Sequence, residues 1–300
     1  MWKLSLLLLG QILAASSVIF IKASGIQAGF LAADRLLLAA FLLLPLFFRE
    51  RSRQKTRSQL DPTIFLPSWK RSILPGVLLG LHLVTWNLGA RMTIAVNASL
   101  IVNLVPVLMP FLAFFILRER PRNYEIAGTV VAAGGLAILS LGAIQLNAKT
   151  LAGDGVCLFS MILVAVYLVL GRRNTAGGLW SYVVPLYAIA GLTALLISLP
   201  FGNPLAQPLT LNDVVAVLGL TILCTIGGHT INNWAMRHFR AQVVSLLGAT
   251  QFVWAGIAAW LLFGELPLAN FYLACVVILT GVSIAIVPRL IHHFYPKEIV

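Results

Sequence analysis

Long runs of apolar residues, separated by short polar segments, form the main pattern along this chain. Each run has about 16 to 22 residues, almost all uncharged, and as a helix rising about 1.5 Å per residue it can cross a hydrocarbon core about 30 Å thick. A transmembrane β-barrel would show alternating segments of about ten residues instead. The pattern predicts an all-α integral membrane protein with ten transmembrane helices, at about 4–21, 30–48, 73–90, 96–117, 126–144, 155–170, 181–199, 214–232, 242–263 and 271–287.

The first run has some features of a cleaved signal peptide. Lys3 precedes a run of leucines, and small residues follow at positions 14–17. The apolar stretch continues to Ile21, however, and the internal repeat described below requires this segment. We therefore expect a retained first helix.

Composition agrees with a membrane protein. Hydrophobic residues make up 60% of the 300 positions, charged residues only 10%, and the mean hydropathy is +0.95. Soluble domains carry roughly a quarter of charged residues, so they are excluded. The three cysteines, Cys157, Cys224 and Cys275, lie in apolar runs without CxxC spacing and are interpreted as buried hydrophobic residues. No metal, cofactor or nucleotide site is expected, because the GxxxxGK[ST] motif is also absent.

The net charge of +12 would indicate nucleic acid in a soluble protein, but here it follows membrane topology. With both termini in the cytoplasm, 17 of the 21 Lys and Arg residues lie on the cytoplasmic side. The positive-inside rule therefore predicts this orientation, with the lipid bilayer as partner and no nucleic acid. The one long polar loop, RERSRQKTRSQLDPTIFLPSWKR at 49–71, is interpreted as a topology determinant, with binding of a partner or of anionic lipid as the alternative.

The chain contains an internal repeat. At an offset of 146 positions, Asn87 matches Asn233 and Arg91 matches Arg237. The identities continue through Ala95/Ala241, Ser99/Ser245, Leu100/Leu246, Ala113/Ala259, Glu119/Glu265, Pro121/Pro267 and Gly135/Gly281. An offset of 150 extends the match to the first helix of each half, through Ala15/Ala165 and Lys22/Arg172.

The two predicted repeats are residues 1–150 and 151–300, with five helices each. Because five is odd, the second repeat enters the membrane from the opposite side and the repeats are inverted. Inverted repeats allow inward-open and outward-open states of similar energy around one central site. The sequence therefore predicts transport by alternating access.

Several segments carry a family resemblance that covers nearly the whole chain. They are DRLLLAAFLLL in the second helix, ASLIVNLVPVLMPFLAFFILRERP into GTVVAAGG, and SLLGATQFVWAGIAAWLLFGELP into VILTG. With these segments the chain resembles EamA-type transporters of the drug/metabolite transporter superfamily. The resemblance implies a ten-helix carrier of the bacterial inner membrane that exports amino acids or other small metabolites. One departure is that Ala14-Ala15 replaces the family's frequent Trp-Gly, which leaves the substrate class open.

Polar residues in the middle of the predicted helices are the candidate substrate-binding residues, because an unpartnered polar group is costly in lipid. His82 lies halfway along the third helix, with Trp86 one turn later on the same face and Thr85 beside them. An imidazole and an indole ring would suit a small zwitterion or an aromatic metabolite. The alternative for His82 is a core histidine bonded to a neighbouring helix.

The eighth helix is the repeat partner of the third and carries His229, within one position of the image of His82. Two histidines on related helices are expected to face one cavity. The same helix carries Thr225, Asn232 and Asn233, for which helix-to-helix hydrogen bonding is an equal alternative.

Two further helices carry candidates at helical spacing. Gln251 and Trp254 are three positions apart in the ninth helix, and Asn103 and Pro106 are three apart in the fourth. Pro106 and Pro110 are expected to kink that helix and to free carbonyl groups, which is tolerated where they line a cavity.

Three further candidates are Arg35, Tyr167 and Tyr187. Arg35 lies one to two turns into the second helix, near Asp34 and the end of the first helix. Arg35 either extends to the outer surface or attracts a substrate carboxylate at the outer mouth of the pathway. Tyr167 and Tyr187 add hydroxyl groups from the sixth and seventh helices.

The acidic residues have simpler interpretations. Glu119 and Glu265 each precede a helix beside a proline and are expected to stabilise its N-terminus, while Asp154 and Asp213 are expected to cap helices. No acidic residue lies near the middle of any span, so proton coupling would use His82, His229 or a boundary group, unless the protein is an uncoupled facilitator.

These observations favour a secondary transporter of small organic metabolites rather than an enzyme. The alternative is a polytopic membrane enzyme or receptor acting on a lipid-soluble molecule. An intramembrane enzyme would need clustered acids and bases or metal ligands, such as HExxH, and the sequence has none.

Overall fold

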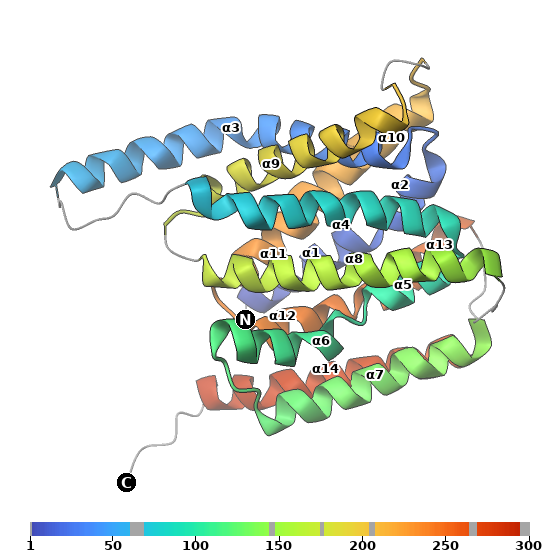
Figure 1. The fold of residues 1–300 in the computed structure, drawn as a ribbon. Coiled ribbons are helices and arrows are strands. Elements are labelled where there is room, and N and C mark those ends of the chain that lie inside the picture. The colour runs from blue at the N-terminus through green and yellow to red at the C-terminus, as the bar shows by residue number, and fades with distance from the viewer. Residues whose placement is uncertain are drawn as a thin grey trace, which may run out of the picture.

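The computed structural model describes residues 2–60, 69–143, 148–174, 177–203, 208–263 and 269–294. Within these ranges the chain forms a bundle of helices with no strand (Figure 1). Nine helical stretches in these ranges are long and apolar enough to cross a membrane. The predicted span at 126–144 is not among these nine but is present as a helix, so each of the ten predicted runs is helical.

The first five predicted runs correspond to helices α1 to α7. Their bounds are α1 Trp2–Ala15, α2 Ser17–Ala23, α3 Ala28–Leu60, η1 Trp69–Ser72, α4 Ile73–Met92, α5 Ala95–Val102, α6 Val105–Leu112, η2 Ala113–Leu117 and α7 Asn123–Ala143. The helix α3 continues well beyond its apolar part into the basic segment after Phe48.

The last five runs correspond to helices α8 to α14. Their bounds are α8 Ala148–Arg173, α9 Trp180–Ser198, η3 Leu199–Phe201, α10 Leu211–Gly219, η4 Leu220–His229, α11 Thr230–Ala235, α12 Ala241–Gly248, α13 Gln251–Phe263 and α14 Ala269–Phe294. Of the short elements, η2 and η4 are π-helices, in which each turn holds one residue more than in an α-helix.

The fourth and ninth predicted helices are interrupted at equivalent positions. The fourth breaks between α5 and α6 at Asn103 and Leu104, and the ninth breaks between α12 and α13 at Ala249 and Thr250. These breaks lie 146 positions apart, the same offset as the sequence identities. The expected kink at Pro106 is therefore an interruption of the α-helix just before this proline, at which the backbone N–H groups of Asn103 and Leu104 still donate to preceding carbonyls.

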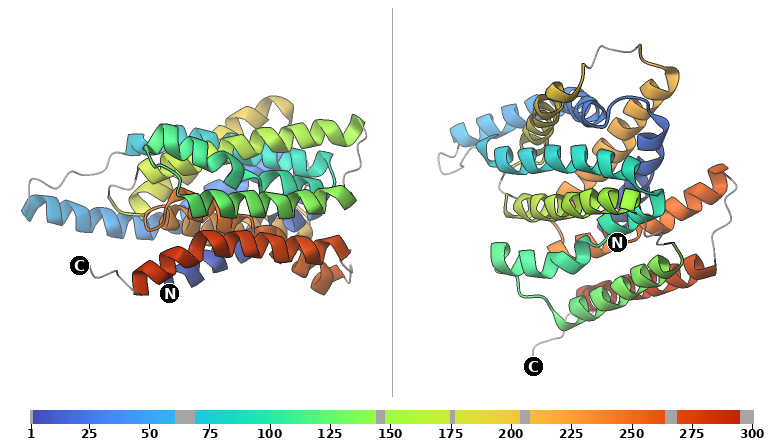
Figure 2. Two further views of the ribbon diagram at one scale, coloured as in Figure 1. Left: turned by 90° about the horizontal axis from the view of Figure 1, so that it is seen from below. Right: turned by 45° about the vertical axis from the view of Figure 1, so that its right-hand side comes forward.

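The main contacts join one half of the chain to the other. The extensive pairs are α3 with α9, α4 with α8 and α7 with α14, and α1 also packs on η4 and α6 on α12 (Figures 1 and 2). An inverted repeat would give this pairing. In the two halves α4 corresponds to η4 and α1 corresponds to α8, so the contact of α4 with α8 has its equivalent in the contact of η4 with α1. The repeat boundary at residue 150 stays a prediction.

Two arginines of the sequence repeat hold equivalent loops. The guanidinium group of Arg91 donates hydrogen bonds to the carbonyls of Ile21, Ser24 and Ile26, between the first and second helices of its half, at 2.7–3.2 Å. Arg237 donates to the carbonyls of residues 177 and 178, between the first and second helices of the other half. The matched arginines thus fix matched connections.

The helices α7 and α14 pack at close range through glycine. A methyl group added at Gly128 would lie 2.5 Å from the carbonyl oxygen of Gly281, and one added at Gly281 would lie equally near the backbone of Ala132. Small residues let membrane helices approach until their backbones touch. This pair lies at one side of the bundle (Figure 2), and neither helix lines the cavity described below.

The two ends of the bundle differ in charge. The start of α1 and the end of α14 lie at the same end (Figures 1 and 2), together with the ends of α3 and α8 and the segments after η2 and α11. These helix ends and segments, with η1, carry most of the described Lys and Arg residues, and by the positive-inside rule this end is called the cytoplasmic end below. The opposite end is called the outer end below.

Two expectations about acidic residues need correction. Glu119 does not stabilise the start of α7; it forms an ion pair with Arg172 at 3.0 Å, and Glu125 accepts the hydrogen bond from the backbone at the start of that helix. Asp154 lies inside α8 rather than at its beginning and accepts a hydrogen bond from Thr93. Glu265 and Pro267 lie outside the described residues.

The expected cap at Asp213 is confirmed. Its carboxylate accepts hydrogen bonds from the backbone and hydroxyl of Thr210, and the Thr210 hydroxyl accepts from the backbone of Asp213 in return. The same carboxylate also accepts from Ser24 and Gly25 of the first half, at 2.9 and 2.8 Å. Asp213 therefore joins the two halves at the outer end as well as capping α10.

A central cavity as the candidate substrate site

A cavity of about 100 Å³ lies in the centre of the bundle. Helices of both halves line it. The first half contributes α1 to α6, and the second half contributes α8, η4, α11, α12 and α13. Its polar lining consists of Gln11, Ser17, Arg35, His82, Asn103, His229, Asn232, Ser245 and Gln251. Five of the nine predicted site residues belong to this polar set, and a sixth, Trp86, also lines the cavity.

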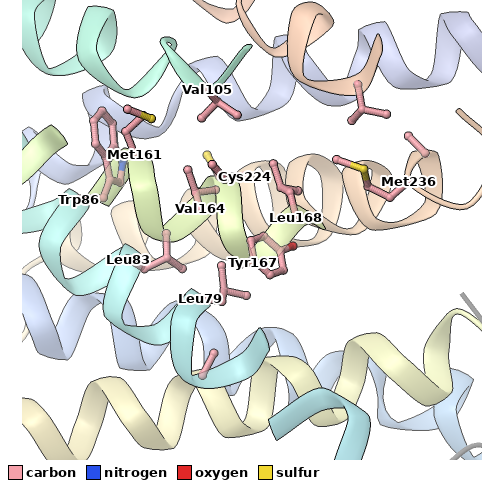
Figure 3. Close-up of a cluster of buried hydrophobic side chains, with 14 of the residues drawn as sticks. Leu79, Leu83, Trp86, Val105, Met161, Val164, Tyr167, Leu168, Cys224 and Met236 are labelled. Atoms are coloured by element: carbon pink, nitrogen blue, oxygen red, sulfur yellow. The ribbon is translucent and has the colours of Figure 1, made fainter. Parts of the chain in front are cut away.

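The opposite part of the lining is apolar. It includes Leu83 and Trp86 from α4 and Val164 and Leu168 from α8, which belong to the buried cluster drawn in Figure 3. The indole nitrogen of Trp86 donates to the hydroxyl of Ser17 at 3.3 Å, so the ring is held against the first helix. A ligand in the cavity would therefore contact hydrocarbon and an indole on one side and polar groups on the other.

His82 is fixed in one orientation by α8. Its Nδ1 lies 2.9 Å from the carbonyl oxygen of Ser160, whose hydroxyl donates to the carbonyl of His82 at 3.0 Å. Nδ1 also lies 2.8 Å from the Ser160 hydroxyl, so this ring atom is engaged by α8 and Nε2 is the ring atom left for the cavity; the contact with the carbonyl, which can only accept, favours the tautomer with its hydrogen on Nδ1. Both interpretations of His82 hold together, because it bonds to a neighbouring helix and lines the cavity.

His229 lies beside His82, as the repeat predicts. The two ring centroids are 6.3 Å apart at an angle of 70°, and the ring of Tyr167 lies 6.3 Å from His229 on another side. Tyr167 itself is fully buried and does not line the cavity; its hydroxyl accepts a hydrogen bond from Asn233. Tyr167 therefore lies behind the imidazole of His229, and its contact with a ligand stays a prediction.

Arg35 lies deeper than expected. The side chain is only 1% exposed, lines the central cavity and donates from Nε to the hydroxyl of Thr225 at 2.9 Å. It does not extend to the outer surface, and its expected position at an outer mouth was wrong. The physical reason is that α3 turns this face inward, so the guanidinium meets η4 instead of water. Asp34, the neighbouring residue, is exposed on another face.

The π-helix η4 positions this part of the site. The hydroxyl of Thr225 accepts from Arg35 and donates to the carbonyl of Leu220, five residues earlier. The carbonyl of Thr225 in turn accepts from the hydroxyl groups of Tyr187 and Thr230. Sequence reasoning named Thr225 and Tyr187, but it did not identify them as the anchor of Arg35. π-Helices frequently occur at functional sites.

A chain of side-chain amides crosses the cavity lining. Gln251 donates to Gln11 at 2.7 Å, and Gln11 donates to Asn232 at 2.8 Å. Gln11 is fully buried and was missed from the sequence, although a single glutamine among leucines in a membrane helix is itself a signal. The chain ties α13, α1 and α11 together across the two halves.

The break in the fourth helix brings Asn103 and Pro106 to the cavity, as predicted. Asn103 donates to the carbonyl of Ser99 at 2.6 Å. The carbonyl of Pro106 accepts from Gln242 of α12 at 3.1 Å, which satisfies a group without its usual helical donor, because residue 110, four positions later, is a proline and has no N–H. A smaller cavity adjoins this region and shares Trp86, Asn103 and Gln251 with the main one.

Thr85 and Trp254 do not line the main cavity. Thr85 donates within its own helix, to the carbonyls of Leu81 and His82. Trp254 follows the break in the ninth helix, and its indole nitrogen is buried without a hydrogen-bond partner. Substrate binding by these two residues stays a prediction that the lining of this cavity does not support.

Contacts between the halves lie at both ends of the cavity. At the cytoplasmic end, Glu119 pairs with Arg172, and Glu125 pairs with Arg240 at 2.7 Å. At the outer end, Thr93 donates to Asp154 at 2.7 Å. In the described part of the chain, no group of three His, Cys, Asp or Glu side chains could hold a metal ion.

The apolar helices and the central cavity define a multi-pass membrane protein. Residues 1–141 match the model of the EamA-like transporter family, so the first part of the chain is similar to that family of transporters. No curated protein matches the chain. Twenty-nine chains of solved structures resemble it. One, described only as a protein crystal structure, has a TM-score of 0.74 at 16% identity, over 95% of this chain and 97% of that chain. At this identity the likeness shows the fold alone.

Proposed function

We propose that this protein is a secondary transporter that exports small organic metabolites, such as amino acids, from the bacterial cytoplasm across the inner membrane. Cargo would occupy the central cavity and reach either side by alternating access between residues 1–150 and 151–300. The observation that carries the proposal is that His82 and His229, from corresponding helices of the two halves, line the same cavity. Inverted-repeat transporters place their substrate between the repeats in this way.

The lining suits a small metabolite. Trp86, Leu83 and Val164 offer apolar contact for a side chain, whereas the polar residues across the cavity offer several hydrogen-bond donors and acceptors. A cavity of about 100 Å³ favours compounds of the size of an amino acid over large lipophilic ones.

The proposal includes protons as the coupling ion. Imidazole is the side chain that titrates nearest neutral pH, and the described lining holds two imidazoles but no carboxylate. The Nε2 atom of His82 is available for a proton, because Nδ1 is already bonded to Ser160. Arg35 and Tyr167 are the other ionisable groups beside these rings.

The experiment is efflux from liposomes that contain the purified protein and a mixed pool of metabolites and amino acids. Mass spectrometry then measures which compounds leave faster than from protein-free liposomes. Selective loss of one chemical class supports a carrier. Equal retention of every compound by correctly inserted protein, both with and without a pH gradient, would contradict the proposal.

A further inference from the structure

Arg35 carries a charge inside the bundle without a counter-ion. It is 1% exposed, and its Nη1 atom is buried and has no hydrogen-bond partner. Among the described residues that line the cavity there is no Asp or Glu. Removing a cation from water costs several kcal/mol even after relaxation, and a partner of opposite charge normally offsets this cost. The protein therefore keeps a costly charge whose partner is not part of its own described cavity.

The guanidinium is held so that its terminal nitrogens stay available. The only hydrogen bond found for its side chain in the described structure runs from Nε to Thr225, which is itself fixed by its bond to Leu220. Anchoring through Nε fixes the plane of the group and leaves the Nη atoms for another acceptor. Planar donors of this kind match carboxylate oxygens, often in two parallel hydrogen bonds.

The rest of the lining complements a carboxylate-bearing ligand. His82 offers Nε2 as an acceptor, and Gln251, which donates its amide hydrogen to Gln11, has its carbonyl oxygen left. These neutral acceptors would suit the ammonium group of a zwitterion. An amine without a carboxylate would instead bring a second positive charge next to Arg35, with no anion nearby to compensate.

We propose that Arg35 binds the carboxylate of the transported compound, so that the cargo is a zwitterion or an organic monoanion and cationic amines are excluded. This inference rests on the proposed function and names its substrate class. It assigns Thr225 as the positioning residue for the guanidinium. Trp86 and the apolar wall then contact the remainder of the ligand.

The test uses matched compounds in the efflux assay. Liposomes are loaded with the common amino acids, their carboxamides, the corresponding decarboxylated amines and the corresponding 2-oxo acids. Wild-type protein is expected to release amino acids or oxo acids at least tenfold faster than the amides and amines. Release of amides or amines at the same rate as the acids would overturn the inference while leaving the proposed carrier function intact.

Variants separate ligand binding from a structural role. Arg35→Gln is expected to abolish release of the acids, and Arg35→Lys and Thr225→Val are expected to raise the KM severalfold. Arg53→Gln is the matched control, because Arg53 is an exposed arginine on the same helix α3, does not line the cavity and should leave release unchanged. Release of acids by Arg35→Gln at the wild-type rate would overturn the inference.

Thermal unfolding of the purified protein gives a second measurement that does not require transport. Without ligand, Arg35→Gln is expected to be at least as stable as wild type, because the uncompensated charge is removed. The amino acids or oxo acids should raise the Tm of wild type but not of Arg35→Gln, and the amides should raise neither. If no compound is transported, the proposed function fails. In that case the inference on Arg35 survives only if the amino acids or oxo acids raise the Tm of wild type and the amides do not; otherwise it fails as well.

Discussion

The imidazole rings of His82 and His229 lie 6.3 Å apart in the central cavity, although 147 positions separate them in the chain. The two rings come from α4 and η4, which the sequence repeat relates to each other. No lining residue in the described structure is a carboxylate, so the proposed proton coupling assigns the proton to these two imidazoles.

Proton coupling is therefore expected to depend on these histidines. Replacing either His82 or His229 by Gln should abolish accumulation driven by a pH gradient, because glutamine keeps hydrogen bonding but does not titrate. Exchange of labelled cargo without a gradient should continue at a reduced rate. The measurement is uptake of the identified cargo with and without an imposed gradient; gradient-driven uptake by the double variant would rule out this role.

Replacing Trp86 by Ala is expected to reduce cargo movement at least tenfold while the protein still folds and inserts. The ring is 6% exposed and forms one wall of the cavity, so its loss removes most of the apolar contact on that side. Leu88→Ala is the matched control, because Leu88 is 43% exposed on the same helix and does not line the cavity. Equal rates for the two variants would remove Trp86 from the pathway.

Arg91→Gln is expected to lower stability rather than affinity for cargo. Its guanidinium group donates hydrogen bonds to the carbonyls of Ile21, Ser24 and Ile26, where the first helix connects to the second. A hydrogen bond from a charged group contributes about 1.5–3 kcal/mol to stability at most. Arg237→Gln should have the same kind of effect at the other connection. Thermal unfolding measures the loss. A changed KM with an unchanged Tm would contradict a structural role for this pair.

Asp213→Ala is expected to lower the thermal stability of the protein, because the carboxylate caps α10 and also binds Ser24 and Gly25 of the other half. Thr210→Ala removes part of the cap and leaves the contact between the halves, so its effect should be smaller. A thermal unfolding series of the two variants checks this order. The reverse order would show that the contact with Ser24 and Gly25 contributes little.

The helices could be predicted from the sequence because lipid requires every backbone group to be bonded within a helix, so apolar length alone marks each span. The polar residues His82, His229, Asn103 and Gln251 could be predicted for the same reason. A polar group in the middle of a span is retained only where it meets a cavity or a partner.

The rotation of each helix could not be predicted in the same way. Arg35 could extend outward or turn inward, and only the packing of α3 decides between these positions. The π-helix that presents Thr225 depends on its contacts with α1 and α3 rather than on a local pattern. Gln251 and Trp254 both lie in α13 after the break, yet only Gln251 lines the cavity, which their three-residue spacing alone could not distinguish.

The central claim is that the two halves open alternately at opposite ends of one cavity. Two pairs of residues join the halves at these ends, Glu119 with Arg172 at the cytoplasmic end and Thr93 with Asp154 at the outer end. In a background without Cys157, Cys224 and Cys275, each pair is replaced by cysteines and joined by a short bifunctional methanethiosulfonate reagent.

Efflux of the identified cargo from liposomes is then measured before cross-linking, after cross-linking and after reduction. The account predicts that a cross-link at either end stops transport and that reduction restores it, because each half-cycle needs one end to separate. Transport at the unmodified rate with either pair fully cross-linked would contradict alternating access between the halves.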